Sequence, residues 1–295
     1  MEFEKISNGY CVVFEKSVKD KDIVIPDYYK GEKVTKVTID NYTSFDFDNF
    51  TLGDNVELLH VKKTFNRYMK WNKHLTIENL VINEKLQEII LDGECLVTNF
   101  INENNPNFEL INGYVFQKYD SSIILRLWNT KEPLINDKRI KKLNFETFIY
   151  HQVDLYIPEN VEEIADKTLY NMYPCNISVH PNNKYFSIIN SCLIELDNNS
   201  LRKVTNSDVD LSKMTFNRTD GYFFLMTSKE VCIPSTCKIM NNLHVPLFLR
   251  FVIETHFKIL DDVLFTGDLE LHCENIELKV NNVDNTILIS NNAVH

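Results

Sequence analysis

A recurring arrangement of apolar and polar positions defines the first element of this chain. A Phe leads an aliphatic stretch, two polar residues interrupt it, and a second apolar stretch follows; copies span 108–116, 186–194 and 257–265. The interrupting pairs are Asn112-Gly113, Asn190-Ser191 and Asp261-Asp262. Asn-Gly between β-prone residues is a strong signal for a two-residue hairpin turn, because both positions favour positive φ. The pattern therefore predicts three short β-hairpins whose leading Phe residues are buried.

A second recurring element is a short apolar strand that ends at a proline. It is present at 23–26, 155–158 and 231–234, and 81–83 is a variant in which Asn83 takes the place of the proline. Proline has no N–H to donate and so ends a hydrogen-bonded ladder. A strand that stops, turns and restarts one coil later indicates a β-solenoid, in which each repeat packs on its neighbours.

These elements resemble the BspA-type leucine-rich repeat family. The best match is Ile157-Pro158-Glu159-Asn160-Val161-Glu162-Glu163-Ile164, and the segment from Asn183 to Ile194 matches the hairpin inserted between repeats of that family. Departures include Cys237 and Met240 in place of the Val and Ile of the turn. The resemblance implies a mainly β fold with short helices, arranged as a leucine-rich-repeat-like solenoid with inserted β-hairpins.

The distribution of these elements suggests two parts of the chain. Residues 1–80 are expected to form an N-terminal cap with the first irregular repeats. Residues 81–295 are expected to form the array, with hairpins near 104–116, 180–194 and 257–265. No segment rich in Gly, Ser or Pro marks a linker between them.

Composition and charge narrow the class of protein. The formal net charge of -11 disfavours nucleic acid and anionic membranes as partners. The start of the chain lacks a basic and apolar leader, no apolar run is long enough to span a membrane, and the 7 cysteines are scattered. These features predict a cytoplasmic protein with reduced thiols.

The sequence lacks the common motifs for nucleotide binding, and it offers only poor candidates for a metal site. The 7 glycines are widely separated, which excludes a P-loop and a dinucleotide-binding fingerprint. His272-Cys273 is a poor metal site because neighbouring residues of a strand point to opposite faces. We therefore expect no catalytic residues, no cofactor and no metal.

One basic stretch, residues 62–74, departs from the acidic character of the chain because it contains no Asp or Glu. Its candidate partner-binding residues are Lys62, Lys63, Arg67, Tyr68, Lys70, Trp71 and Lys73. They fit a contact with an acidic or phosphate-bearing partner. The alternative is an amphipathic segment with core aromatics and solvated lysines. An acidic stretch at 254–277 also permits head-to-tail self-association.

The resulting hypothesis is a non-enzymatic protein–protein interaction scaffold. It would bind an intracellular partner through a solenoid face and act as a regulator or antagonist of another protein complex. Relatives of the BspA type are largely surface adhesins and interaction proteins, so a secreted or surface adhesin is the alternative. An enzyme of unrecognised type is a third possibility, and it would require a deep pocket with perturbed titratable groups.

Overall fold

The chain folds mainly as β-structure, as the sequence predicts. The computed structural model describes residues 1–15, 18–40, 45–62, 75–92, 95–145, 154–170, 176–205, 209, 211–222, 230–233, 236, 239–240, 244–245, 250–253, 258–259, 263–265, 269–271, 281–283 and 286–289. Within these ranges the helical elements are α1 (Asp166–Tyr170) and a short 3₁₀ turn, η1 (Leu211–Lys213). No helix in these ranges is long and apolar enough to cross a membrane.

The chain divides into two compact units. Unit 1 comprises residues 1–135 and 139–146, and unit 2 comprises residues 136–138 and 147–295. The expected division at residue 80 falls inside strand β8 (Leu75–Ile82), which pairs with a strand on each side. Residues 1–80 and the strands that follow them up to residue 135 lie in the same compact unit.

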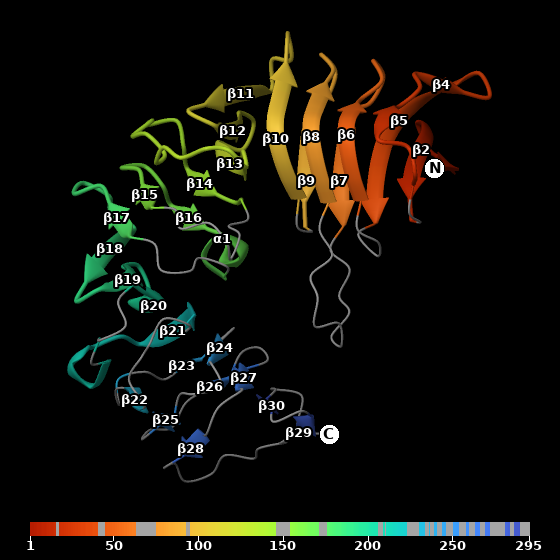
Figure 1. Ribbon diagram of the computed structural model, residues 1–295. Coiled ribbons are helices and arrows are strands. Elements are labelled where there is room, and N and C mark those ends of the chain that lie inside the picture. Colours follow the sequence, from red (N-terminus) through yellow and green to blue (C-terminus); the bar gives the residue numbers. More distant parts are fainter. Residues whose placement is uncertain are drawn as a thin grey trace. The chain divides into compact units, whose positions relative to one another are not determined.

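Two sheets build the larger part of unit 1, and from β5 to β10 successive strands of the chain alternate between them (Figure 1). One sheet has the order β1-β2-β5-β7-β9, with β4 also paired to β5, and the other has the order β10-β8-β6-β3. The bounds are β1 (Glu2–Ile6), β2 (Gly9–Phe14), β3 (Asp22–Val24), β4 (Tyr28–Tyr29), β5 (Glu32–Asp40), β6 (Phe45–Thr51), β7 (Leu58–Lys62), β9 (Glu88–Leu91) and β10 (Cys95–Asn102). All these pairings are parallel except β1–β2 and β4–β5.

The core of unit 1 lies between these two sheets. Phe14 of β2 and Phe50 of β6 are fully buried, and their ring centroids lie 5.7 Å apart. Phe47 lies 5.3 Å from Phe50 in the same cluster. Each buried aromatic ring removes a large apolar area from water, so this cluster is a major source of stability for the unit.

Two of the three predicted hairpins are confirmed. β11 (Phe108–Ile111) pairs antiparallel with β12 (Tyr114–Gln117), and β18 (Phe186–Ile189) pairs antiparallel with β19 (Cys192–Glu195). The turn residues have positive φ as predicted: 50° and 83° at Asn112-Gly113, and 47° and 58° at Asn190-Ser191. The leading residues, Phe108 and Phe186, are buried.

The third predicted hairpin is not present among the described strands. β26 (Lys258–Ile259) pairs with β23 (Ile239–Met240), whereas β27 (Val263–Phe265) pairs with β24 (His244–Val245) and β30 (Thr286–Ile289). Its leading Phe257 and its turn, Asp261-Asp262, lie outside the described residues. The segment 257–265 therefore resembles the first two hairpin segments in sequence, but its described strands pair with other strands instead of with each other.

The remaining strands complete the two units. Unit 1 adds β13 (Ser122–Arg126), antiparallel to β12, and β14 (Lys142–Leu143), parallel to β13. In unit 2, β15 (Leu155–Ile157) pairs parallel with β17 (Ile177–Val179), and β22 (Glu230–Ile233), β25 (Arg250–Ile253) and β28 (Leu269–Leu271) form a second parallel sheet. The other strands of unit 2 are β16 (Glu163–Ile164), β20 (Ser200–Val204), β21 (Arg218–Tyr222) and β29 (Asn281–Val283).

Asparagine side chains hold the turns that follow the strands. In unit 2, the Nδ2 of Asn183 donates to the carbonyls of Pro158 and Val161 (2.7 and 3.0 Å), and its Oδ1 accepts from the backbone N–H groups of Tyr185 and Phe186 (both 2.8 Å). One side chain thus satisfies two carbonyls of an earlier turn and two amides of its own. Buried backbone groups need such partners, since an unmet one is costly.

The same device is present twice in unit 1. Asn83 donates to the carbonyls of Gly53 and Val56 (2.5 and 3.0 Å), and Asn105 donates to those of Asn83 and Leu86 (2.7 and 2.8 Å). Asn83 occupies the position where the repeat pattern has a proline. Its side chain bonds to the preceding turn, which explains why the strand can end there without a proline.

We expect Asn183→Ala to lower the free energy of unfolding by about 3 kcal/mol, because it leaves two carbonyls and two amides without partners. Urea denaturation followed by circular dichroism measures this change. The matched control is Asn182→Ala, since Asn182 is exposed and neighbours the same turn; we expect it to change stability by less than about 0.5 kcal/mol. Equal stability of the two variants would contradict the assignment.

Candidate functional site

Most of the basic stretch selected from the sequence lies outside the described residues. Lys62 is the last residue of β7 and is exposed. Lys63, Arg67, Tyr68, Lys70, Trp71 and Lys73 fall in the range 63–74, which the structure does not describe. The role of this stretch as a partner contact therefore stays a prediction.

Three thiols of the described part of the chain lie in the interior. Cys11, Cys95 and Cys192 are buried and form no disulfide. Burial raises the pKa of Cys192 to about 12, and it also raises the pKa of Cys11. A thiol with a raised pKa is a poor nucleophile, because the thiolate is the reactive form. No cluster of three or more His, Cys, Asp or Glu residues that could hold a metal lies in the described part of the chain.

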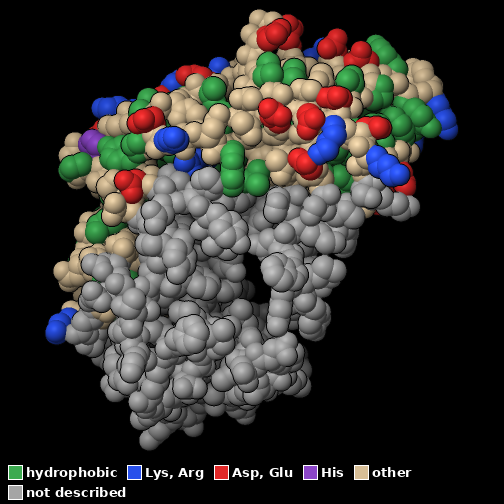
Figure 2. Space-filling model, in the orientation of Figure 1, with side chains coloured by type: hydrophobic (Ala, Val, Ile, Leu, Met, Phe, Trp, Pro, Cys, Tyr) green, Lys and Arg blue, Asp and Glu red, His purple; other side chains and the backbone are tan. Residues whose placement is uncertain are grey.

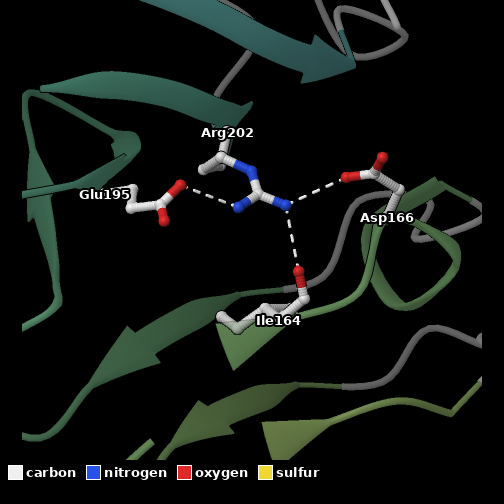
Figure 3. Close-up of polar contacts among 4 residues, drawn as sticks. All are labelled: Ile164, Asp166, Glu195 and Arg202. Carbon is white, nitrogen blue, oxygen red and sulfur yellow. Dashed lines mark hydrogen bonds and ion pairs between the residues drawn. The ribbon is translucent and has the colours of Figure 1, made fainter. Parts of the chain in front are cut away.

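Unit 2 contains a cluster of charged side chains around the buried Arg202 of β20 (Figure 3). The Nη1 of Arg202 donates to Glu195 of β19 at 2.9 Å, and its Nη2 donates to Asp166 at 2.9 Å and to the carbonyl of Ile164 at 3.0 Å. The Arg202 side chain is only 10% exposed, whereas Glu195 and Asp166 are 23% and 42% exposed. Both carboxylates are therefore engaged by the same cation.

The next residue along β20 binds the other end of the same helix. Lys203 is 1% exposed, and its Nζ donates to the carbonyl of Leu169 at 2.7 Å. Arg202 contacts Asp166 at the first residue of α1, so β20 holds this helix near both of its ends. A cation beside the C-terminal carbonyls of a helix is favourable. We interpret the pair as a means of docking α1.

A shallow depression of about 400 Å³ in unit 2 is lined in part by Ser178, His180 and Ser187. This combination of residue types could suggest a hydrolytic site. However, the Nδ1 of His180 accepts from the backbone N–H of Asn182 at 3.1 Å and so is engaged within its own turn. The described contacts give these serines no activating base.

The outer surface of the sheet β10-β8-β6-β3 in unit 1 presents many exposed polar side chains, and we name it the polar sheet face. Because the strands are parallel and in register, equivalent side chains form rows across it. The rows are Asp46–Thr76–Leu96, Asp22–Asn49–Asn79–Asn99 and Val24–Thr51–Val81–Ile101, with Asp48, Glu78 and Thr98 on the strands between the first two.

An asparagine ladder crosses this face. The Nδ2 of Asn99 donates to the Oδ1 of Asn79 at 2.9 Å, and the Nδ2 of Asn79 donates to the Oδ1 of Asn49 at 3.0 Å. The Nδ2 of Asn49 donates to Asp22 at 2.5 Å. Stacked amides of this kind stabilise in-register parallel strands. The ladder therefore fixes the relative register of the strands that present the face.

A local break in side-chain alternation places the ladder on the surface. Successive strand residues normally point to opposite faces, yet Asp48 and Asn49 are both exposed between the buried Phe47 and Phe50. The pattern of buried residue, polar residue, Asn and buried residue recurs at 77–80 and 97–100. This recurrence is visible in the sequence, although our sequence analysis did not select it as a candidate site.

Comparison with known proteins adds no further assignment: no family model matches the chain, and neither a curated protein nor a solved structure matches it.

We expect Arg202→Ala to lower the free energy of unfolding by about 2–3 kcal/mol, since it removes the donor for two carboxylates and one carbonyl that water reaches only in part. Arg202→Met retains the apolar stem, so its loss should be smaller. Thermal denaturation of both variants beside the parent chain measures the difference. Parent-like stability of Arg202→Ala would show that the cluster is not structural.

We expect Cys192 in the folded chain to resist alkylation by iodoacetamide at about pH 8, because its thiolate is scarce when the pKa is raised. Peptide mass spectrometry of folded and urea-unfolded chains measures the labelled fraction. The unfolded chain is the control, in which labelling should be fast. Equal rates in the two states would contradict the assignment of Cys192 as an inert core thiol.

Proposed function

We propose that this protein is a non-enzymatic scaffold for protein–protein interaction, built as a leucine-rich-repeat-like solenoid of the BspA type with inserted hairpins. It would bind an intracellular partner in the cytoplasm, as a regulator or antagonist of another protein complex. The observation that carries the proposal is the alternation of successive strands between the two sheets of unit 1. Such an arrangement presents side chains of many coils on one continuous surface.

Two further features support this proposal. The turns are linked from coil to coil by Asn83 and Asn105, which suits an array that grows by stacking. Two hairpins interrupt the series, as the repeat family leads one to expect. An extended, rigid surface of this kind binds through its side chains rather than through a backbone motif.

Affinity purification of the tagged full chain from its native cells tests the proposal. We expect a specific protein to co-purify, and we expect the purified pair to form a complex of defined stoichiometry in isothermal titration calorimetry. An unrelated acidic protein of similar size, carrying the same tag, controls for charge-driven capture. A chain that forms no complex with any protein purified in this way would refute the scaffold function.

A further inference from the structure

The charged side chains of the polar sheet face are mainly acidic. Asp22, Asp46, Asp48 and Glu78 lie on it, and Lys21 forms an ion pair with Asp46 at its border. The carboxylates of Asp48 and Glu78 lie on exposed residues, and no side-chain hydrogen bond is described for either, although Asp48 interacts electrostatically with Lys21. Figure 2 shows red carboxylate side chains, with some blue basic ones among them, on the described part of the surface. The face is therefore complementary to a cationic surface.

An apolar row accompanies these charges. Val24, Val81 and Ile101 occupy one row across the sheet; Val24 is 68% exposed and Ile101 is 37% exposed. Single exposed apolar residues are common, but a row of β-branched side chains on a rigid sheet is a surface that a partner can cover. The combination favours a partner that supplies both positive charge and apolar contact.

The spacing of the rows sets the size of the partner segment. Four parallel strands span about 14 Å from β3 to β10, and Glu78 lies about 10 Å along its strand from Val81. An extended segment of about four to five residues covers the width of the sheet. A contact of this size is far smaller than that of a stable complex, so it should be weak and sensitive to salt.

We propose that the polar sheet face of unit 1 binds a cationic segment of a partner protein that also carries apolar side chains. This inference rests on the scaffold function and names the chemistry of the partner. The asparagine ladder holds the four strands in register, so the acidic and apolar rows are positioned before the partner arrives. Preorganisation of this kind limits the entropic cost of binding.

Binding of labelled peptides to the full-length chain, followed by fluorescence anisotropy, tests the proposal. The probe is the peptide Lys-Val-Lys-Ser-Lys-Val-Lys, and two control peptides replace its lysines by glutamate or its valines by serine. We expect the cationic apolar probe to bind at least about 10-fold more tightly than the glutamate peptide at low salt. Raising the NaCl concentration from about 50 to about 300 mM should weaken its binding.

Two double variants connect this binding to the face. Asp48→Asn with Glu78→Gln removes two exposed charges at nearly constant shape, and we expect it to weaken binding of the probe about 5-fold and to reduce the dependence on salt. Val81→Ser with Ile101→Ser should weaken binding without changing that dependence. The matched control is Glu4→Gln with Glu84→Gln, which removes two exposed acids of unit 1 elsewhere and should leave the affinity nearly unchanged.

Equal affinities for the lysine and glutamate peptides would overturn the proposal, as would an unchanged affinity in the Asp48→Asn, Glu78→Gln variant. Failure here is separable from failure of the scaffold function. If a partner purified with the full chain binds the parent and this variant equally, the scaffold function stands and the polar sheet face is not its site.

Discussion

The satisfaction of backbone polar groups at the turns is the constraint on which the rest of this structure depends. Parallel strands that alternate between two sheets require frequent turns, and each turn leaves carbonyls without a partner in a ladder. Asn83, Asn105 and Asn183 meet this need by donating to an earlier turn. Because each bond links one turn to an earlier turn, these side chains also hold successive turns beside one another, and the aromatic cluster around Phe50 packs between the two sheets of unit 1.

Features of the fold that depend on adjacent residues could be predicted from the sequence, whereas those that depend on distant residues could not. The hairpins at Asn112-Gly113 and Asn190-Ser191 were predictable because the preference for positive φ lies within the turn residues themselves. The third hairpin was not, since the pairing of β26 and β27 depends on strands distant in the chain. The contacts of Arg202 were equally inaccessible, because its partners lie 7 and 36 residues away and no spacing rule connects them.

The charged side chains serve different purposes in the two units. Arg202 and Lys203 are buried and joined to α1, where their directional bonds define a packing arrangement at a cost in desolvation. On the polar sheet face, Asp48 and Glu78 are exposed, and no side-chain hydrogen bond ties either of them to the described part of the fold. A candidate binding surface is therefore more evident in the charges that the fold does not use than in those that it does.

The asparagine ladder has a consequence for how such a protein can change in evolution. Its links join residues at the same register position of neighbouring strands: two join asparagines that are 30 and 20 residues apart, and the third joins Asn49 to Asp22, 27 residues apart. The length of the intervening chain is thus free to vary while the link is preserved. The chain could therefore gain a strand, or a longer loop between two strands, while the register of the existing strands is kept.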